Sequence, residues 1–235
     1  MRNLKRVLSL ALASVMLIGM MVVGASAANY DDFSDKDKIV NKEAVSTLVE
    51  LGVIAGKDDG TYDPTGIVTR GEMAKMICVV LNGGKDPSLG NVTKYSYTDT
   101  VGHWAAPYIE YCAIRGIVAG KGDGTFGPNE TVTGSQAAKM LLVAAGYQSA
   151  IEGFTGANWE VNTNVRANAV GLYDGLDINP SQGLTRDSAA QMVYNAIQSK
   201  TMKLSWSQDM TTGQITQQYT LSGNPLFVDK FGGQV

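Results

Sequence analysis

The 235-residue chain has few of the side chains from which disulfide scaffolds and metal sites are built. It contains two cysteines, Cys78 and Cys112, and one histidine, His103. Two cysteines are too few for a disulfide framework, and a lone histidine cannot form a metal cluster or a cysteine–histidine catalytic pair. We therefore expect no metal and no cofactor. Counting residues does not exclude a catalytic pair of carboxylates, because 22 acidic residues offer many combinations.

An excess of positive charge is also missing. The chain has 19 Lys and Arg against 22 Asp and Glu, and three of the basic residues (Arg2, Lys5 and Arg6) belong to the extreme N-terminus. Without those three, 16 basic residues face 22 acidic ones, a formal net charge of −6. Because no basic stripe is present, the composition argues against nucleic acid and against anionic membrane surfaces as partners.

A long apolar run follows the basic N-terminus, from Val7 to Val23. The run is short for a membrane span and no cluster of positive charge follows it, which argues against a transmembrane helix. Ala25-Ser26-Ala27 then supplies the small residues that signal peptidase reads. We predict a signal peptide over residues 1–27 that is cleaved after Ala27. The mature protein is then expected to be secreted and to have no membrane partner.

Internal repetition is the strongest feature of the remaining chain. Gly52–Val79 aligns without gaps to Gly116–Val143 at an offset of 64, and 14 of the 28 positions are identical. A worn third copy follows, because Trp159 lies 55 residues after Trp104 and Thr185 lies 52 after Thr133. The periodicity predicts repeats over 28–84, 92–147 and, in degenerate form, 154–200.

Each copy has the pattern of two helices joined by a loop. The first helix of copy one is predicted from apolar residues three or four apart, and copy two repeats the spacing: Val40, Ala44, Leu48 and Leu51, then Trp104, Tyr108 and Cys112. The second helices follow the same rule: Met73, Met76, Ile77 and Val80; Ala137, Met140, Leu141 and Ala144; Ala189, Met192, Val193 and Ala196. Because one helix pair cannot cover its own apolar faces, we expect a mainly α fold with three helix-loop-helix repeats around a pseudo-threefold axis and both cysteines in the core.

The ends of these helices carry recognisable signals. Gly52 and Gly116 are expected to close the first helices in the left-handed conformation. Thr69-x-x-Glu72 and Thr133-x-x-Gln136 are capping boxes, and Thr185 is the corresponding cap in the third copy. The loops between the helices fit neither a calcium site nor a phosphate site, since they lack the spaced acidic ligands of the first and the Gly-Lys-Ser/Thr ending of the second.

Several spaced motifs of the chain resemble the S-layer homology (SLH) domain family over roughly Tyr30 to Lys200. These motifs are Phe-Ser-Asp (33–35), Val-Thr-Arg-Gly-Glu (68–72), His-Trp-Ala (103–105), Gly-Ile-Val-x-Gly (116–120) and Asp-Gly-Thr-Phe-x-Pro (123–128). The resemblance implies a three-pronged helical spindle whose grooves bind a pyruvylated secondary cell wall polysaccharide. It further implies a cell-surface, S-layer or cell wall location, a non-enzymatic anchoring role, and this anionic polysaccharide and other S-layer subunits as candidate partners.

Two arginines lie where a helix ordinarily disfavours positive charge. Arg70 and Arg186 directly follow their capping threonines, where a cation opposes the helix dipole at a cost of roughly 0.3–1 kcal/mol. One hypothesis is that each arginine and the free amides beside it form an anion site; the other is that each is simply solvated. With the resemblance, the candidate glycan-binding residues are Arg70, Arg186, Trp104, Trp159, Asp35, Asp99, Thr69 and Thr185.

Departures from the family pattern reduce the expected number of sites. Gly134 stands where copy two should have an arginine, and Val40 stands where copy one should have a tryptophan. Copy three lacks the Asp-Gly-Thr-Phe loop. We therefore predict fewer than three working grooves, those of Arg70 and Arg186.

The C-terminal region, residues 201–235, leaves the helical pattern. Two β-prone segments, Lys203–Trp206 and Gln214–Leu221, flank Met210–Gly213 and predict a hairpin that packs on the repeats or begins a further domain. Two alternative functions stay open: the N-terminal portion of a lattice-forming structural S-layer protein, or the anchor of an exoenzyme whose catalytic domain is absent here.

Overall fold

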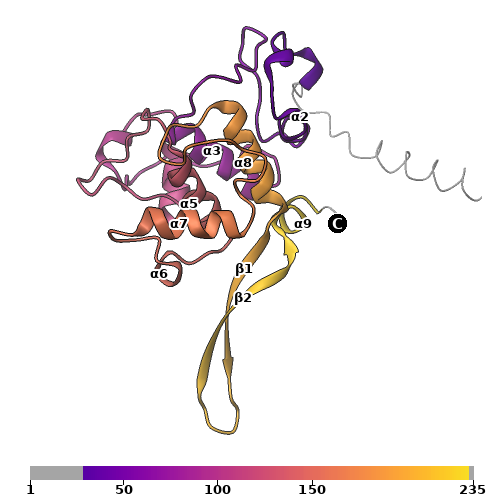
Figure 1. Ribbon diagram of the computed structural model, residues 1–235. Helices are drawn as coiled ribbons and strands as arrows, with labels where there is room; N and C mark the ends of the chain where they lie inside the picture. Colours follow the sequence, from indigo (N-terminus) through magenta and orange to yellow (C-terminus); the bar gives the residue numbers. More distant parts are fainter. Residues whose placement is uncertain (1–28, 233–235) are drawn as a thin grey trace, which may run out of the picture.

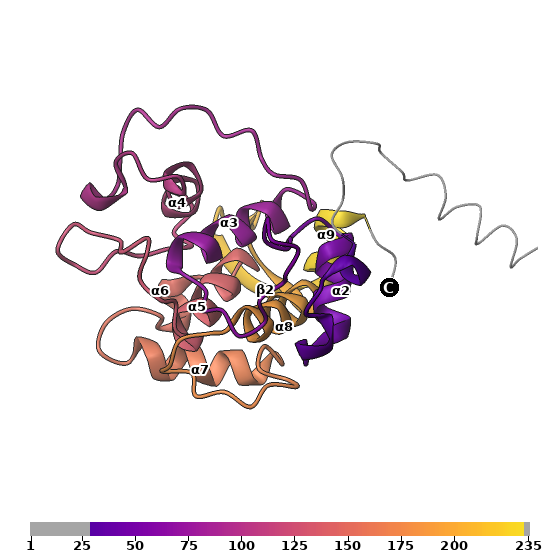
Figure 2. The same ribbon diagram turned by 90° about the horizontal axis from the view of Figure 1, so that it is seen from above.

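A computed structural model describes residues 29–232, so the predicted signal peptide lies outside the described residues. Figures 1 and 2 show a helical body from which a hairpin extends. The α-helices are α2 (Lys42–Glu50), α3 (Arg70–Leu81), α4 (Ala106–Ile114), α5 (Gly134–Ala144), α6 (Ser149–Glu152), α7 (Trp159–Ala169), α8 (Arg186–Gln198) and α9 (Leu226–Phe231). The strands are β1 (Lys200–Gln208) and β2 (Ile215–Pro225), and three short 3-10 helices are η1 (Tyr30–Asp32), η2 (Lys36–Lys38) and η3 (Thr98–Thr100).

Three pairs of helices correspond to the three repeats: α2 with α3, α4 with α5, and α7 with α8. The second helix of each repeat packs on the first helix of the next, and α8 of repeat 3 returns to α2 of repeat 1. Seen from above in Figure 2, α3, α5 and α8 lie towards the middle and α4, α7 and α2 lie outside them. The repeats thus close on one another instead of extending as an open stack.

A ring of three backbone hydrogen bonds marks the pseudo-threefold axis. The N–H of Val68 donates to the carbonyl of Leu184, that of Leu184 donates to Val132, and that of Val132 donates to Val68, each at 3.0 Å. The three side chains are buried, and burying each contributes about 1.5–3 kcal/mol. The axis predicted from the repeats is confirmed, and this ring satisfies the backbone groups of all three buried residues.

The predicted helix ends are confirmed. Both capping boxes form, with Thr69 and Thr133 accepting from the third amide of their helices, and Thr185 accepts from Ser188 in the same way. Gly52 and Gly116 have φ angles of 72° and 68°, the left-handed conformation that closes a helix without a Cβ clash.

The apolar faces of the second helices are confirmed as core, but the start of the first helices is not where the spacing placed it. Met73, Ile77 and Val80 are buried in α3 and Met76 is half-buried; their counterparts in α5 and α8 are buried except the half-buried Ala144. Val40 precedes α2 and is 81% exposed, because the chain turns into the helix at Asn41. Trp104 likewise precedes α4, so neither residue belongs to the helix.

The two cysteines are confirmed as buried core residues between repeats 1 and 2. Cys78 on α3 faces Cys112 on α4, with their sulfur atoms 3.6 Å apart. The hydrogen bond to the neighbouring thiol and burial raise the pKa of Cys112, so its thiol is protonated at neutral pH. In residues 29–232 no helix is long and apolar enough to cross a bilayer.

The C-terminal hairpin is confirmed and extends away from the helices in Figure 1. Its base is attached to the end of repeat 2 and to α6, which follows that repeat: Met202 donates its N–H to the carbonyl of Ala145, and the hydroxyl of Tyr219 donates to Glu152 at 2.9 Å. After β2 the chain forms α9, which the sequence pattern did not predict, and Leu226 of α9 is buried near the end of α8. The hairpin therefore packs on the repeats at its base alone.

Candidate functional site

Arg70 reaches from repeat 1 into the loop of repeat 2. Its Nε donates to the carbonyl of Phe126 and its Nη2 to the carbonyl of Ala119, both at 2.9 Å. Its guanidinium carbon lies 4.3 Å from the centre of the Phe126 ring, within the range of a cation–π contact. Arg70 is 8% exposed, and burial lowers the pKa of the guanidinium, which still stays charged at neutral pH.

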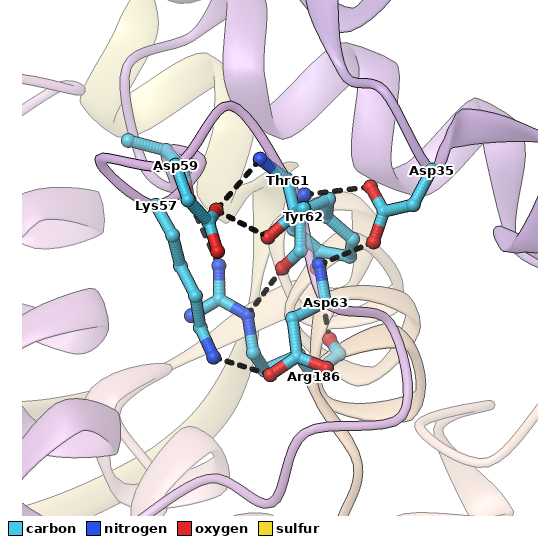
Figure 3. Close-up of polar contacts among 8 residues, drawn as sticks. Asp35, Lys57, Asp59, Thr61, Tyr62, Asp63 and Arg186 are labelled. Atoms are coloured by element: carbon cyan, nitrogen blue, oxygen red, sulfur yellow. Dashed lines mark hydrogen bonds and ion pairs between the residues drawn. The ribbon is translucent and has the colours of Figure 1, made fainter.

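Arg186 makes the equivalent contacts from repeat 3 into the loop of repeat 1 (Figure 3). Its Nε donates to the carbonyl of Tyr62 and its Nη2 to the carbonyl of Ala55, both at 2.8 Å, and its guanidinium carbon lies 4.8 Å from the Tyr62 ring centre. The hypothesis of simply solvated arginines is therefore wrong. Among the described residues, Nη1 of each arginine has no hydrogen-bond partner, so each guanidinium is fixed through its other two nitrogens.

The amides beside these arginines are not free. In α3 the N–H of Arg70 donates to the carbonyl of Glu130 and the N–H of Gly71 to that of Pro128, both at 2.9 Å. In α8 the N–H of Arg186 donates to Gly66 at 2.7 Å. The anion site expected from free helix amides is therefore wrong, because the loop of the neighbouring repeat occupies them. The guanidinium contacts, by contrast, explain why a positive charge is tolerated at the start of these helices, since two loop carbonyls compensate the charge of each arginine.

Two equivalent cavities lie beside the arginines, each where three repeats meet. The Arg70 groove, about 340 Å³, is bounded by that arginine, by residues 117–120, by Lys139 and Met140 of α5, and by Trp159. The Arg186 groove, about 240 Å³, is bounded by Arg186 and by the residues that correspond in the preceding repeat: residues 53–55, Lys75 and Met76 of α3, and Trp104. Each groove thus combines one fixed guanidinium, one lysine and one tryptophan.

One tryptophan lines each of these cavities together with an arginine. Trp104 is 53% exposed and lies beside Tyr108, with the ring centres 6.4 Å apart. Trp159 is half-buried, and the Nζ of Lys139 lies 5.4 Å from its ring centre. An aromatic ring at the wall of a cavity offers a flat apolar surface on which the ring of a sugar can stack.

The other four predicted site residues line neither groove. Asp35 accepts from the backbone N–H groups of Tyr62 and Asp63, as Figure 3 shows, and Asp99 makes the same two bonds in repeat 2. Burial alone would raise the pKa of Asp99, but the N–H groups of Phe126 and Gly127 hold it below its ordinary value. Thr69 and Thr185 cap α3 and α8. These four residues hold the loops and helices that position the arginines.

The third junction, between repeats 2 and 3, has no equivalent cavity among those described. Gly134 packs so closely on repeat 3 that an added Cβ would lie 2.8 Å from the Cα of Pro180. Gln191 stands in the place of Lys75 and Lys139, and Val40 stands in that of the tryptophan. Fewer than three working grooves stays our prediction, and the packing of Gly134 supplies a steric reason for it.

The two groove lysines were not among the predicted site residues. A signal for them existed, because Lys75 and Lys139 occupy the same position of the repeat and are polar side chains beside the apolar face of a helix. Asp86, which lines the Arg186 groove, left no such signal because it belongs to the irregular linker between the repeats. Chemically, a guanidinium nitrogen, an ammonium group and an aromatic ring suit an anionic sugar.

Comparison with known proteins identifies the first two repeats. The S-layer homology domain model matches residues 32–74 and 96–138. The chain is 28% identical to an uncharacterized cell wall amidase of Bacillus anthracis over 143 residues, 60% of this chain and 26% of that protein. It is 27% identical to an S-layer protein of Bacillus licheniformis over 161 residues, 65% of this chain and 18% of that protein. It is 25% identical to the middle cell wall protein of Brevibacillus brevis over 197 residues, 83% of this chain and 18% of that protein. The chain thus spans about a quarter or less of the length of these relatives.

Proposed function

Since this chain is a bacterial surface protein that carries S-layer homology domains, we propose that it attaches to the cell wall by binding a pyruvylated, anionic polysaccharide. The observation that carries the proposal is the pair of equivalent grooves, each with a fixed guanidinium, a lysine and a tryptophan. The role is that of a non-catalytic anchor.

The chemistry of the grooves suits a carboxylate attached to a sugar. The free Nη1 of Arg70 and the Nζ of Lys139 can both donate to a pyruvyl carboxylate, and hydrogen bonds between charged groups are the stronger ones. The guanidinium is already held by two backbone carbonyls, so binding does not have to order its long side chain. The ring of Trp159 can at the same time cover the apolar face of the sugar.

The test is co-sedimentation of the chain with purified cell walls, before and after the pyruvylated polysaccharide is removed. We expect binding to disappear with the polymer and to fall strongly in the double variant Lys75→Gln, Lys139→Gln. The matched control is Lys42→Gln, Lys203→Gln, which removes the same charge at exposed positions outside both grooves. Binding that survives loss of both the polymer and the groove lysines would contradict the proposal.

Lysines are better probes than the two arginines. Because Arg70 and Arg186 join neighbouring repeats, replacing them disturbs the fold as well as the groove. Lys139 forms no ion pair among the described residues, and burial lowers the pKa of its amine, so its charge is held at a cost to stability. We therefore expect Lys139→Gln to bind the wall less without a lower melting temperature.

The relatives name two further roles to test. One relative is an S-layer protein, which favours a structural lattice as the second candidate function. Concentration-dependent assembly of the chain without polysaccharide, followed by light scattering, would support the lattice. Another relative is named a cell wall amidase, so release of wall fragments by this chain alone would contradict a non-catalytic anchor.

A further inference from the structure

The two grooves have the same plan but different charge. The residues that line the Arg70 groove include two cations, Arg70 and Lys139, and no acidic side chain. The residues that line the Arg186 groove include two cations, Arg186 and Lys75, and two carboxylates, Glu72 and Asp86. Their formal sums are therefore +2 and zero.

The lysine of the Arg186 groove is already paired. Asp86 lies 3.2 Å from the Nζ of Lys75 through one oxygen and accepts from the hydroxyl of Tyr108 at 2.7 Å through the other. Burial and this hydrogen bond raise the pKa of Tyr108 to about 12, so the hydroxyl keeps its proton and holds Asp86 in place. A ligand carboxylate entering this groove would meet the like charge of Asp86 beside Lys75.

The lysine of the Arg70 groove has no such partner. Its helix carries Gln136 where α3 carries Glu72, and among the described residues no carboxylate lies within ion-pair distance of Lys139. Its Nζ lies over the Trp159 ring instead, at 5.4 Å from the centre. A half-buried ammonium group without a counter-ion gains more from an incoming anion than one that is already neutralised.

Resting on the proposed function, we infer that the Arg70 groove is the site of the pyruvyl carboxylate and that Asp86 makes the Arg186 groove selective for an uncharged sugar of the same polymer. Lys139 and Asp86 are then the residues that distinguish the grooves. One chain accordingly binds one carboxylate-bearing sugar tightly, although two grooves share the same framework.

Isothermal titration of the full chain with a 4,6-O-pyruvylated hexoside tests this inference. The matched probe is the 4,6-O-isopropylidene hexoside, in which a methyl group replaces the carboxylate. We expect one site for the pyruvylated hexoside, at least tenfold weaker binding in Lys139→Gln, and a smaller loss of affinity in Lys75→Gln than in Lys139→Gln. Asp86→Asn should create a second site for the pyruvylated hexoside. The affinity of this variant for the isopropylidene hexoside should equal that of the native chain.

Tryptophan fluorescence locates the occupied groove. Quenching by the pyruvylated hexoside should disappear in Trp159→Phe and persist in Trp104→Phe. Two equal sites for the pyruvylated hexoside in the native chain would overturn the inference and leave the proposed function standing. So would a loss of affinity in Lys75→Gln as large as that in Lys139→Gln. No binding of the pyruvylated hexoside to the native chain or to Asp86→Asn, with wall association unaffected by removal of the polymer, would overturn both.

Discussion

Replacing Arg70 with methionine removes the side-chain contacts by which repeat 1 holds the loop of repeat 2. The buried carbonyl of Phe126 loses its donor, which lowers the free energy of unfolding by about 1–3 kcal/mol. The carbonyl of Ala119 is more accessible to water, so the loss of its hydrogen bond costs about 0.5–1.5 kcal/mol. Loss of the cation–π contact with Phe126 adds about 0.5–1 kcal/mol, and the methionine recovers part of the packing. We expect the free energy of unfolding to fall by about 2–4 kcal/mol.

The equivalent change at Arg186 supplies the control. Its hydrogen bonds are more exposed, so water can replace them, and we expect Arg186→Met to lower the free energy of unfolding by about 1–2 kcal/mol. Equilibrium unfolding in urea, followed by circular dichroism, measures the free energy of unfolding of both variants. The comparison holds if the slope of this free energy against urea concentration is the same as in the native chain. A loss below about 1 kcal/mol in Arg70→Met, or a larger loss in Arg186→Met, would refute the assignment of Arg70 as the stronger link between repeats.

Three further predictions concern the third junction, the loops and the hairpin. Gly134→Arg should not create a third groove but should lower the melting temperature, since its Cβ would meet the backbone of Pro180, and an unchanged melting temperature would contradict this. The pKa of Asp99 is lowered in the folded chain, so its carboxylate stabilises the fold above about pH 4 and this contribution is lost as the pH falls through the lower folded value. Asp99→Asn should therefore unfold in acid with a shallower pH dependence, and an unchanged acid transition would count against this role. Tyr219→Phe removes the hydroxyl that bonds Glu152, so amide exchange in β1 and β2 should accelerate while the repeats unfold at nearly the same temperature; equal exchange rates would show that this bond does not attach the hairpin.

The helices and their ends could be predicted because their causes lie close together in the sequence. A capping box links residues three apart, as Thr69 and Glu72 do, and the apolar face of a helix repeats every three or four residues. The three-fold arrangement followed from the repeat itself, because each helix pair leaves an apolar face that another pair must cover. The exceptions, Val40 and Trp104, are apolar residues that fit the helical spacing but precede the turn into the helix, which spacing alone does not reveal.

The role of the arginines depended on contacts across the fold. The dipole argument singled out Arg70 and Arg186 correctly as unusual, but it treated the neighbouring amides as free, because the carbonyls that occupy them come from another repeat. In the same way, Arg186 meets Tyr62 across 124 residues of sequence.

The sequence by itself determined the repeats, the helix caps and the likeness to a family that anchors proteins to cell walls, since these depend on local patterns and on their recurrence. The tertiary structure alone decided which arginine shares a groove with which tryptophan, because each groove is assembled from three repeats whose closure brings distant residues together. It also decided that Asp86 pairs with the lysine of one groove and that no acidic residue lines the other. An irregular linker has no period from which the position of its side chains could be read, so the contribution of Asp86 to the difference in charge emerges only when the chain is folded.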